Sequence, residues 1–152
     1  MLNIVLFEPE IPQNTGNIGR LCVCNGLNLH LIKPLGFEIS DKYLKRSGLD
    51  YWQYLKINIY ENWQEFYSPR HNSQFWFLTT KAQKTLWQVK FKEDDYLVFG
   101  PESRGLPLEL RANPENSLLI PMFSEDYKRS LNLSTSVGIV AYEALRQIKI
   151  LS

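Results

Sequence analysis

Glycine, proline and ionisable side chains gather in one short stretch of the sequence, residues 100–107. The apolar run 96–99 stops at Gly-Pro, and an acid, a hydroxyl and a guanidinium follow at Glu102, Ser103 and Arg104. A rigid polar loop at the carboxyl end of a buried strand is where open α/β sheets bind ligands. The alternative is an ordinary strand-to-helix turn, because Gly and Pro punctuate any connection.

Two more apolar runs end in polar loops. The run 74–79 ends at Thr79-Thr80, and the segment 118–122 ends at Ile120-Pro121-Met122 before residues 130–132. If the three strands are parallel neighbours, their loops share one sheet edge and can surround one ligand. The loops offer mainly backbone N–H and C=O groups, which suit a flat heterocycle such as adenine better than a triphosphate. Neither the glycine-rich dinucleotide fingerprint nor the P-loop pattern is present.

Other site chemistries find little support in the sequence. His30 falls within an expected strand and His71 in a turn, which argues against a Ser-His-Asp triad. No cluster of His, Cys and carboxylates has metal-ligand spacing, so we expect no metal. Cys22 and Cys24 are the only cysteines, and their spacing on an expected helix directs the thiols to different faces. Reduced thiols of a cytosolic protein are the favoured interpretation.

The first third of the chain predicts the unit that supports such loops. The apolar run 2–7 suits a strand covered on both faces. A helix follows, capped by Asn14 or Thr15 and ended by Asn25-Gly26. A second strand at 29–32 completes a βαβ unit with two parallel strands.

The rest of the chain predicts shorter elements and one long helix. We expect strands at 57–60, 74–79, 96–99 and 118–122, and helices at 62–67, capped by Asn62, and at 108–111. The helix 134–149 is the clearest, capped by Asn132 or Ser134, with Glu143 and Gln147 on its solvated side. Gly138 within it suggests close approach by another backbone. Its buried stripe follows helical spacing at Val137, Val140, Ala141, Ala144, Leu145 and Ile148.

Composition fits one α/β domain over residues 1–152, with a mostly parallel sheet flanked by helices. The chain is 44% apolar and 22% charged, and its net charge is +1. Any basic surface must therefore be a local patch. No apolar run approaches the length of a membrane span, and the N-terminus lacks the basic region of a signal peptide. We expect a cytoplasmic protein without membrane contact.

The order of three motifs resembles a known family. Residues 12–20 (PQNTGNIGR), 97–107 (LVFGPESRGLP) and 120–122 (IPM) with 130–134 (SLNLS) follow the three motifs of the SPOUT (SpoU-type) RNA 2′-O-methyltransferases. The start LNIVLFEPE and the segment 46–51 (RSGLDY) resemble the branch of tRNA (cytidine/uridine-2′-O)-methyltransferases that act on the wobble nucleotide. Thr135 replaces a usual Asn, and Asp126-Tyr127-Lys128 lengthens the connector before Arg129.

The resemblance implies a fold and a ligand. The fold is a deep trefoil knot in the C-terminal half, holding S-adenosylmethionine as methyl donor in a bent conformation. It also implies a homodimer formed through the motif helices and tRNA as partner. By motif position the cofactor-binding residues are Leu78, Thr79, Gly100, Glu102, Ile120, Met122, Ser130, Leu131 and Asn132.

The resemblance also assigns a catalytic residue, Arg20. A guanidinium stays protonated, which makes it a poor general base. Our hypothesis is that Arg20 binds the phosphate beside the target ribose and stabilises developing alkoxide charge. Candidate RNA contacts are Lys42, Lys45, Arg46, Lys81, Lys128 and Arg129, with Tyr51 or Trp52 as stacking partners.

Two alternatives to this enzyme remain open. The chain could be an RNA-binding member of the family that has lost turnover, for which Thr135 is the only hint. It could also be a methyltransferase that acts on ribosomal RNA.

Overall fold

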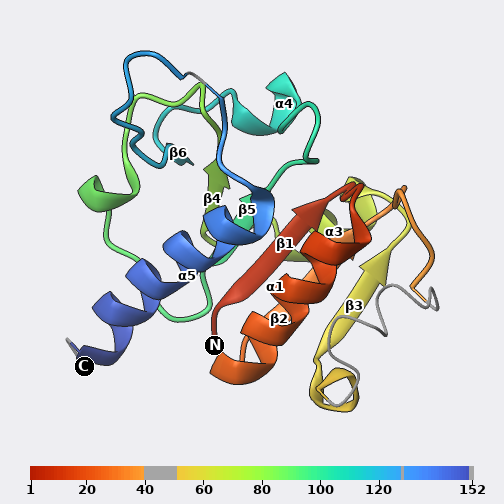
Figure 1. The fold of residues 1–152 in the computed structure, drawn as a ribbon. Helices are drawn as coiled ribbons and strands as arrows, with labels where there is room; N and C mark the ends of the chain where they lie inside the picture. The colour runs from red at the N-terminus through yellow and green to blue at the C-terminus, as the bar shows by residue number, and fades with distance from the viewer. Residues whose placement is uncertain (40–50, 128, 151–152) are drawn as a thin grey trace.

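A six-stranded parallel sheet organises the computed structural model, which describes residues 1–39, 51–127 and 129–150. The strand order is β3-β2-β1-β5-β4-β6, so the chain crosses over from one half of the sheet to the other between β3 and β4 (Figure 1). The strands are β1 (Asn3–Phe7), β2 (Asn28–Ile32), β3 (Ile57–Tyr60), β4 (Phe75–Leu78), β5 (Tyr96–Phe99) and β6 (Ser117–Leu118). The expected α/β class is confirmed.

Helices cover both faces of the sheet. The two long helices, α1 (Pro12–Asn25) and α5 (Leu133–Ile150), pack against each other on one face (Figure 1). The short elements are η1 (Trp52–Tyr54), α3 (Trp63–Tyr67), η2 (Ser68–Arg70), η3 (Leu86–Gln88) and α4 (Leu108–Arg111). No helix among the described residues is long and apolar enough to cross a membrane.

Each central strand supplies apolar side chains to two separate layers. On β1, Ile4 and Leu6 join the layer beneath α1 and α5, whereas Val5 joins the layer beneath α3. All three side chains are at most 1% exposed. Successive strand residues point to opposite faces, so an uninterrupted apolar run is what a doubly covered strand requires.

Helix α1 begins at Pro12, before both of its expected caps. Ile11 occupies the N-cap without a side-chain hydrogen bond, and Pro12 starts the helix. Proline suits this position because its fixed φ is helical and its missing N–H has no intrahelical partner there. The prediction that Asn14 or Thr15 caps α1 is therefore wrong. The predicted stop is confirmed, since Gly26 takes a φ of 64°.

Helix α5 confirms the predicted stripe and corrects two details. Its stripe from Val137 to Ala144 is buried, and Asn132 Oδ1 accepts from the N–H of Ser134 at 2.9 Å. Gln147 is not solvated, because it accepts from Phe91 N at 2.8 Å and donates to Val89 O at 3.2 Å. A Cβ on Gly138 would meet nothing within 4 Å among the described residues, so none of their backbone approaches it.

The last strand is much shorter than the expected 118–122. Only Ser117 and Leu118 pair with β4, and Leu119 forms a single parallel bridge to Thr85. Pro121 has no N–H to continue the ladder, which fits an early end. The trefoil knot implied by the resemblance stays a prediction.

Candidate functional site

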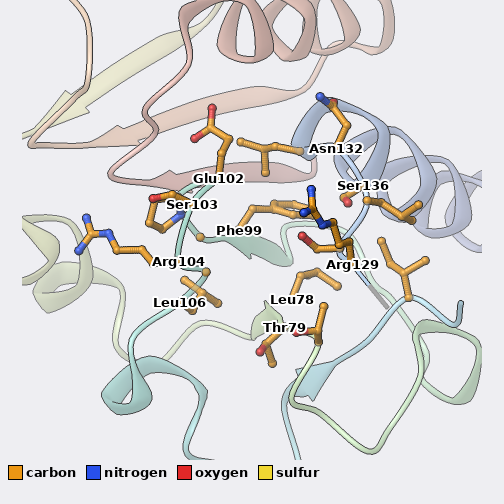
Figure 2. Close-up of a pocket in the computed structure, with 18 of the residues that line it drawn as sticks. Leu78, Thr79, Phe99, Glu102, Ser103, Arg104, Leu106, Arg129, Asn132 and Ser136 are labelled. Atoms are coloured by element: carbon orange, nitrogen blue, oxygen red, sulfur yellow. The ribbon is translucent and has the colours of Figure 1, made fainter. Parts of the chain in front are cut away.

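A cavity of about 710 Å³ opens at the carboxyl ends of β4 and β5. Residues 78–81 after β4 and 99–106 at the end of β5 form two of its walls (Figure 2). The segment after β6 and the start of α5 close it. The cavity therefore lies where the three sequence-predicted loops meet at one sheet edge.

The structure brings together all the residues predicted to bind a cofactor. The lining of the cavity includes Leu78, Thr79, Gly100, Glu102, Ile120, Met122, Ser130, Leu131 and Asn132. The size falls within the range of pockets that hold small ligands. Leu78, Phe99 and Leu106 supply apolar side chains to the lining.

Gly100 is required by the protein's own backbone. A Cβ there would lie 2.3 Å from the N of Leu106 and 2.4 Å from the carbonyl carbon of Gly105. The loop after β5 turns back over the strand end, helped by Gly105 at a φ of 68°. The absence of a side chain at Gly100 therefore makes room for residues 105–106.

Glu102 ties this loop to the start of α1. Its carboxylate accepts from the N–H groups of Glu10 and Ile11, both at 2.8 Å, and from Asn14 Nδ2 at 3.2 Å. These N–H groups stand at the positive end of α1, where a carboxylate is stabilised. Glu102 lines the cavity, but its carboxylate is occupied by the protein's own donors.

Asn14 extends this connection to the start of α5. Its Oδ1 accepts from Asn132 Nδ2 at 3.1 Å, and Asn132 Oδ1 caps α5. Asn14 is 5% exposed and lines the cavity. Glu102, Asn14 and Asn132 therefore join the loop after β5, α1 and α5 in one hydrogen-bonded series. Residue identity alone did not indicate this role for Asn14, because its partners are 88 and 118 positions away.

A second set of contacts holds the outer side of the same loop. Ser103 donates to Glu10 Oε1 through its N–H at 2.8 Å and through its hydroxyl at 2.7 Å, which lowers the pKa of the Glu10 carboxyl. Arg104 pairs with Glu8 Oε1 at 2.6 Å. In Figure 2, Arg104 is directed away from Phe99 and Leu78. The loop after β5 and the connection between β1 and α1 are thereby fixed relative to each other.

Positive side chains outnumber negative ones around the cavity. Lys81, Arg104, Arg111 and Arg129 belong to its lining, against the occupied carboxylate of Glu102. Lys81 and Arg129 are also among the sequence-predicted RNA contacts, and that role stays a prediction. The sequence did not predict Arg111 or Ser136 as lining residues. Ser136 lies on the first turn of α5, four residues after the cap at Asn132, and that position was a usable signal.

Arg20 is the predicted site residue that the structure does not bring to the cavity. It lies exposed on α1, outside the lining, and forms no hydrogen bond or ion pair with the described residues. Tyr51 is also corrected as a stacking candidate, because it is buried and donates to Gly16 O. Lys42, Lys45, Arg46 and Lys128 lie outside the described residues.

The histidines and cysteines have the structural roles expected from the sequence. His30 contacts Tyr60 through Nδ1 and Asn3 through Nε2, both at 3.0 Å, and burial lowers its pKa to about 4. Cys22 is buried and Cys24 exposed, and neither forms a disulfide. Within the described ranges, no group of His, Cys, Asp and Glu is arranged to hold a metal ion.

Comparison with known proteins identifies close relatives over nearly the full length. The profile of the SpoU rRNA Methylase family matches residues 1–142. A tRNA (cytidine(34)-2'-O)-methyltransferase of Saccharophagus degradans is 49% identical over 97% of this chain and 96% of its own. The enzyme of that name from Methylovorus glucosotrophus is 48% identical, with the same coverage. A solved structure described as "Structural insights into the 2-OH methylation of C/U34 on tRNA" is 44% identical, covers 97% and 95% of the two chains and has a TM-score of 0.91.

Proposed function

This chain belongs to the SpoU rRNA Methylase family, and we propose that it moves a methyl group from S-adenosylmethionine to the ribose 2′-OH of the tRNA wobble nucleotide, C or U at position 34. The observation that carries the proposal is the cavity, which gathers every motif residue assigned to the cofactor. Relatives named for this reaction align over nearly all of the chain.

The lining of the cavity fits S-adenosylmethionine. Leu78, Phe99 and Ile120 offer apolar surface for an adenine, and backbone groups beside them can read its edge. Arg111 and Arg129 are cations suited to the carboxylate of the methionine part. Bound there, S-adenosylmethionine would supply an electrophilic methyl group on its sulfonium.

The protein's contribution to methyl transfer is positioning. The loops fixed by Glu102 and Asn14 hold one reactant against the other, and such orientation can remove about 7–11 kcal/mol of a barrier. Arg20 would bind a phosphate beside the target ribose and stabilise the developing alkoxide, in keeping with a guanidinium that stays charged.

A homodimer would supply Arg20 to the cavity. In a single chain Arg20 lies outside the lining, whereas the neighbouring face of α5 exposes Ile139 at 37% and Tyr142 at 55%. Open space at Gly138, which adjoins Ile139 and lies one turn before Tyr142, lets another helix approach closely. We infer that α1 and α5 meet a second copy and that Arg20 of one copy serves the cavity of the other.

Incubation with labelled S-adenosylmethionine and bulk tRNA or rRNA, followed by nucleoside analysis, tests the reaction. We expect 2′-O-methylcytidine or 2′-O-methyluridine at position 34 of tRNA. Product in rRNA alone would favour the rRNA activity that the family description names. RNA binding without any product would favour the inactive RNA-binding alternative.

Mixing two inactive variants tests the dimer. Arg20→Ala and Gly100→Ala should each abolish methylation, but a mixture refolded together should recover about a quarter of the activity. That fraction follows from hybrid dimers, half of the population, in which one of two sites is intact. No recovery, in a preparation shown to contain hybrids, would mean that Arg20 acts on its own chain's cavity.

A further inference from the structure

Two exposed aromatic side chains stack on each other beside the cavity. Trp87 of η3 is 61% exposed and Phe123 is 81% exposed, and their rings lie 6.4 Å apart between centroids at 16°. Both belong to segments on the β6 side of the sheet, because Thr85 before η3 bridges to Leu119 and Phe123 follows β6. The reaction proposed above assigns no role to either residue.

The capping of η3 holds Trp87 in place. Thr85 caps η3 by accepting from Trp87 N at 3.3 Å, and Gln88 completes the capping box by accepting from Thr85 N at 2.8 Å. Leu86, between them, is fully buried, and Leu119 bridges to Thr85. The exposed Trp87 side chain therefore lies on a turn whose backbone is fixed by its cap and by the buried Leu86.

The pair adjoins the cavity through a continuous hollow. A second depression contains Phe123 and shares Thr80, Met122, Tyr127, Arg129 and Ser130 with the cavity lining. The Arg129 guanidinium lies 5.9 Å from the centre of the Tyr127 ring, which is 65% exposed. Aromatic and cationic surface thus extends outward from the place where a target ribose would bind.

The charge around Trp87 indicates which partner fits. Residues 81–92 include Lys81, Lys84, Lys90 and Lys92 and no Asp or Glu. Lys84 is paired with Glu115 at 3.3 Å, and Glu125 adds one carboxylate to the second depression. Lysines interleaved with exposed aromatic rings suit single-stranded nucleic acid, whose phosphates meet the cations and whose bases stack on the rings.

We propose that Trp87 and Phe123 form a stacking platform for an unpaired base next to the methylated nucleotide. The inference rests on the proposed function, because it takes RNA as the substrate. Loop nucleotides have splayed bases that stack on aromatic side chains, whereas paired bases do not. The platform would set the register in which the loop enters the cavity.

Crosslinking tests the contact directly. A synthetic anticodon stem-loop RNA with 5-iodouridine beside position 34 should crosslink to Trp87 or Phe123, identified by mass spectrometry of the digest. The same RNA with 5-iodouridine in its stem should not. Crosslinks from the loop to other sites only would overturn the proposal.

Binding measurements separate stacking from charge. Trp87→Leu and Phe123→Leu should each weaken binding of this stem-loop about 5- to 100-fold, the range for loss of one base–aromatic stack, while the slope of affinity against salt stays the same. Trp87→Phe should recover most of the affinity. Ile59→Ala, an exposed apolar side chain on β3, is the matched control and should bind as wild type.

The outcomes distinguish this inference from the proposed function. Wild-type methylation with unaltered binding by both leucine variants would overturn the platform and leave the function standing. Absence of methylation by wild type would count against the function, while crosslinks at Trp87 would still support the platform. A change of oligomeric state in Trp87→Leu, seen by sedimentation velocity, would mean that a second copy covers the pair and would overturn the proposal.

Discussion

Two polar networks in this protein use similar groups for opposite purposes. At the cavity, Glu102, Asn14 and Asn132 connect loops and helix ends at the edge of the sheet. Under α3, Arg70, Tyr60, His30 and Asn3 connect neighbouring strands inside it. The first network joins the loop after β5 to the N-terminal ends of two helices. The second network lies within an aromatic layer that already packs the strands it connects.

The buried network has one consistent proton arrangement. Asn3 Oδ1 accepts from His30 Nε2, Tyr60 donates to Nδ1, and the Tyr60 oxygen accepts from Arg70 at 3.0 Å. We assign the tautomer from these partners. Added charge on His30 would lie in a buried site beside the Arg70 guanidinium, so both burial and Arg70 lower its pKa. The comparison predicts that mutations at the cavity alter ligand binding, and that mutations under α3 alter stability.

Gly100→Ala should give the largest effect. Its Cβ would overlap backbone atoms of Gly105 and Leu106, so the loop after β5 must move, at a cost of about 3 kcal/mol or more. Urea unfolding and calorimetric titration of S-adenosylmethionine would show lower stability and loss of binding. Ile59→Ala, at an exposed position on β3, is the control and should leave cofactor binding unchanged, because β3 lies at the edge of the sheet away from the cavity. Normal binding by Gly100→Ala would contradict the loop's role.

Acid should destabilise the protein through His30. Its pKa of about 4 lies below the usual 6.5, so the unfolded state binds more protons between these values. The free energy of unfolding should fall as pH drops below 6.5, by about 3 kcal/mol in total, with the loss complete below pH 4. Comparing urea unfolding of wild type and His30→Gln isolates this contribution. His71→Gln, at an exposed turn, should follow wild type, and equal pH slopes for wild type and His30→Gln would refute the assignment.

Glu102→Gln should separate binding from stability. The amide would face N–H groups that now donate to a carboxylate, at a cost of about 1–3 kcal/mol in local order. We expect about tenfold weaker cofactor binding and a melting temperature within a few degrees of wild type. Glu109→Gln on α4 is an exposed control. A large loss of melting temperature without loss of affinity would remove the distinction between the two networks.

Arg104→Ala should give the smallest effect. The Arg104 side chain is 60% exposed in its pair with Glu8, and exposed ion pairs contribute about 0–1 kcal/mol. Thermal unfolding at low and high salt should differ by less for the variant than for wild type. A loss comparable to that of Glu102→Gln would place Arg104 in the positioning network.

The sequence predicted the elements and the lining better than the connections. Continuous apolar runs such as residues 2–7 indicate doubly covered strands, and the strand ends mark the cavity without any knowledge of contacts. The bonds from Glu102 to Glu10 and Ile11 join positions about 90 residues apart, and no local pattern encodes them. The same applies to Gln147, which was expected on the surface. Its hydrogen bonds to the backbone of residues 89 and 91 instead join α5 to the segment before β5.

The two cysteines of α1 offer a practical consequence. Burial raises the pKa of the Cys22 thiol to about 12, so it has almost no thiolate at neutral pH, whereas Cys24 is exposed. A maleimide dye should therefore attach at one place, on the helix that we expect to meet a second chain. The native sequence carries its own site for a fluorescent reporter, whose emission would register when that helix becomes covered.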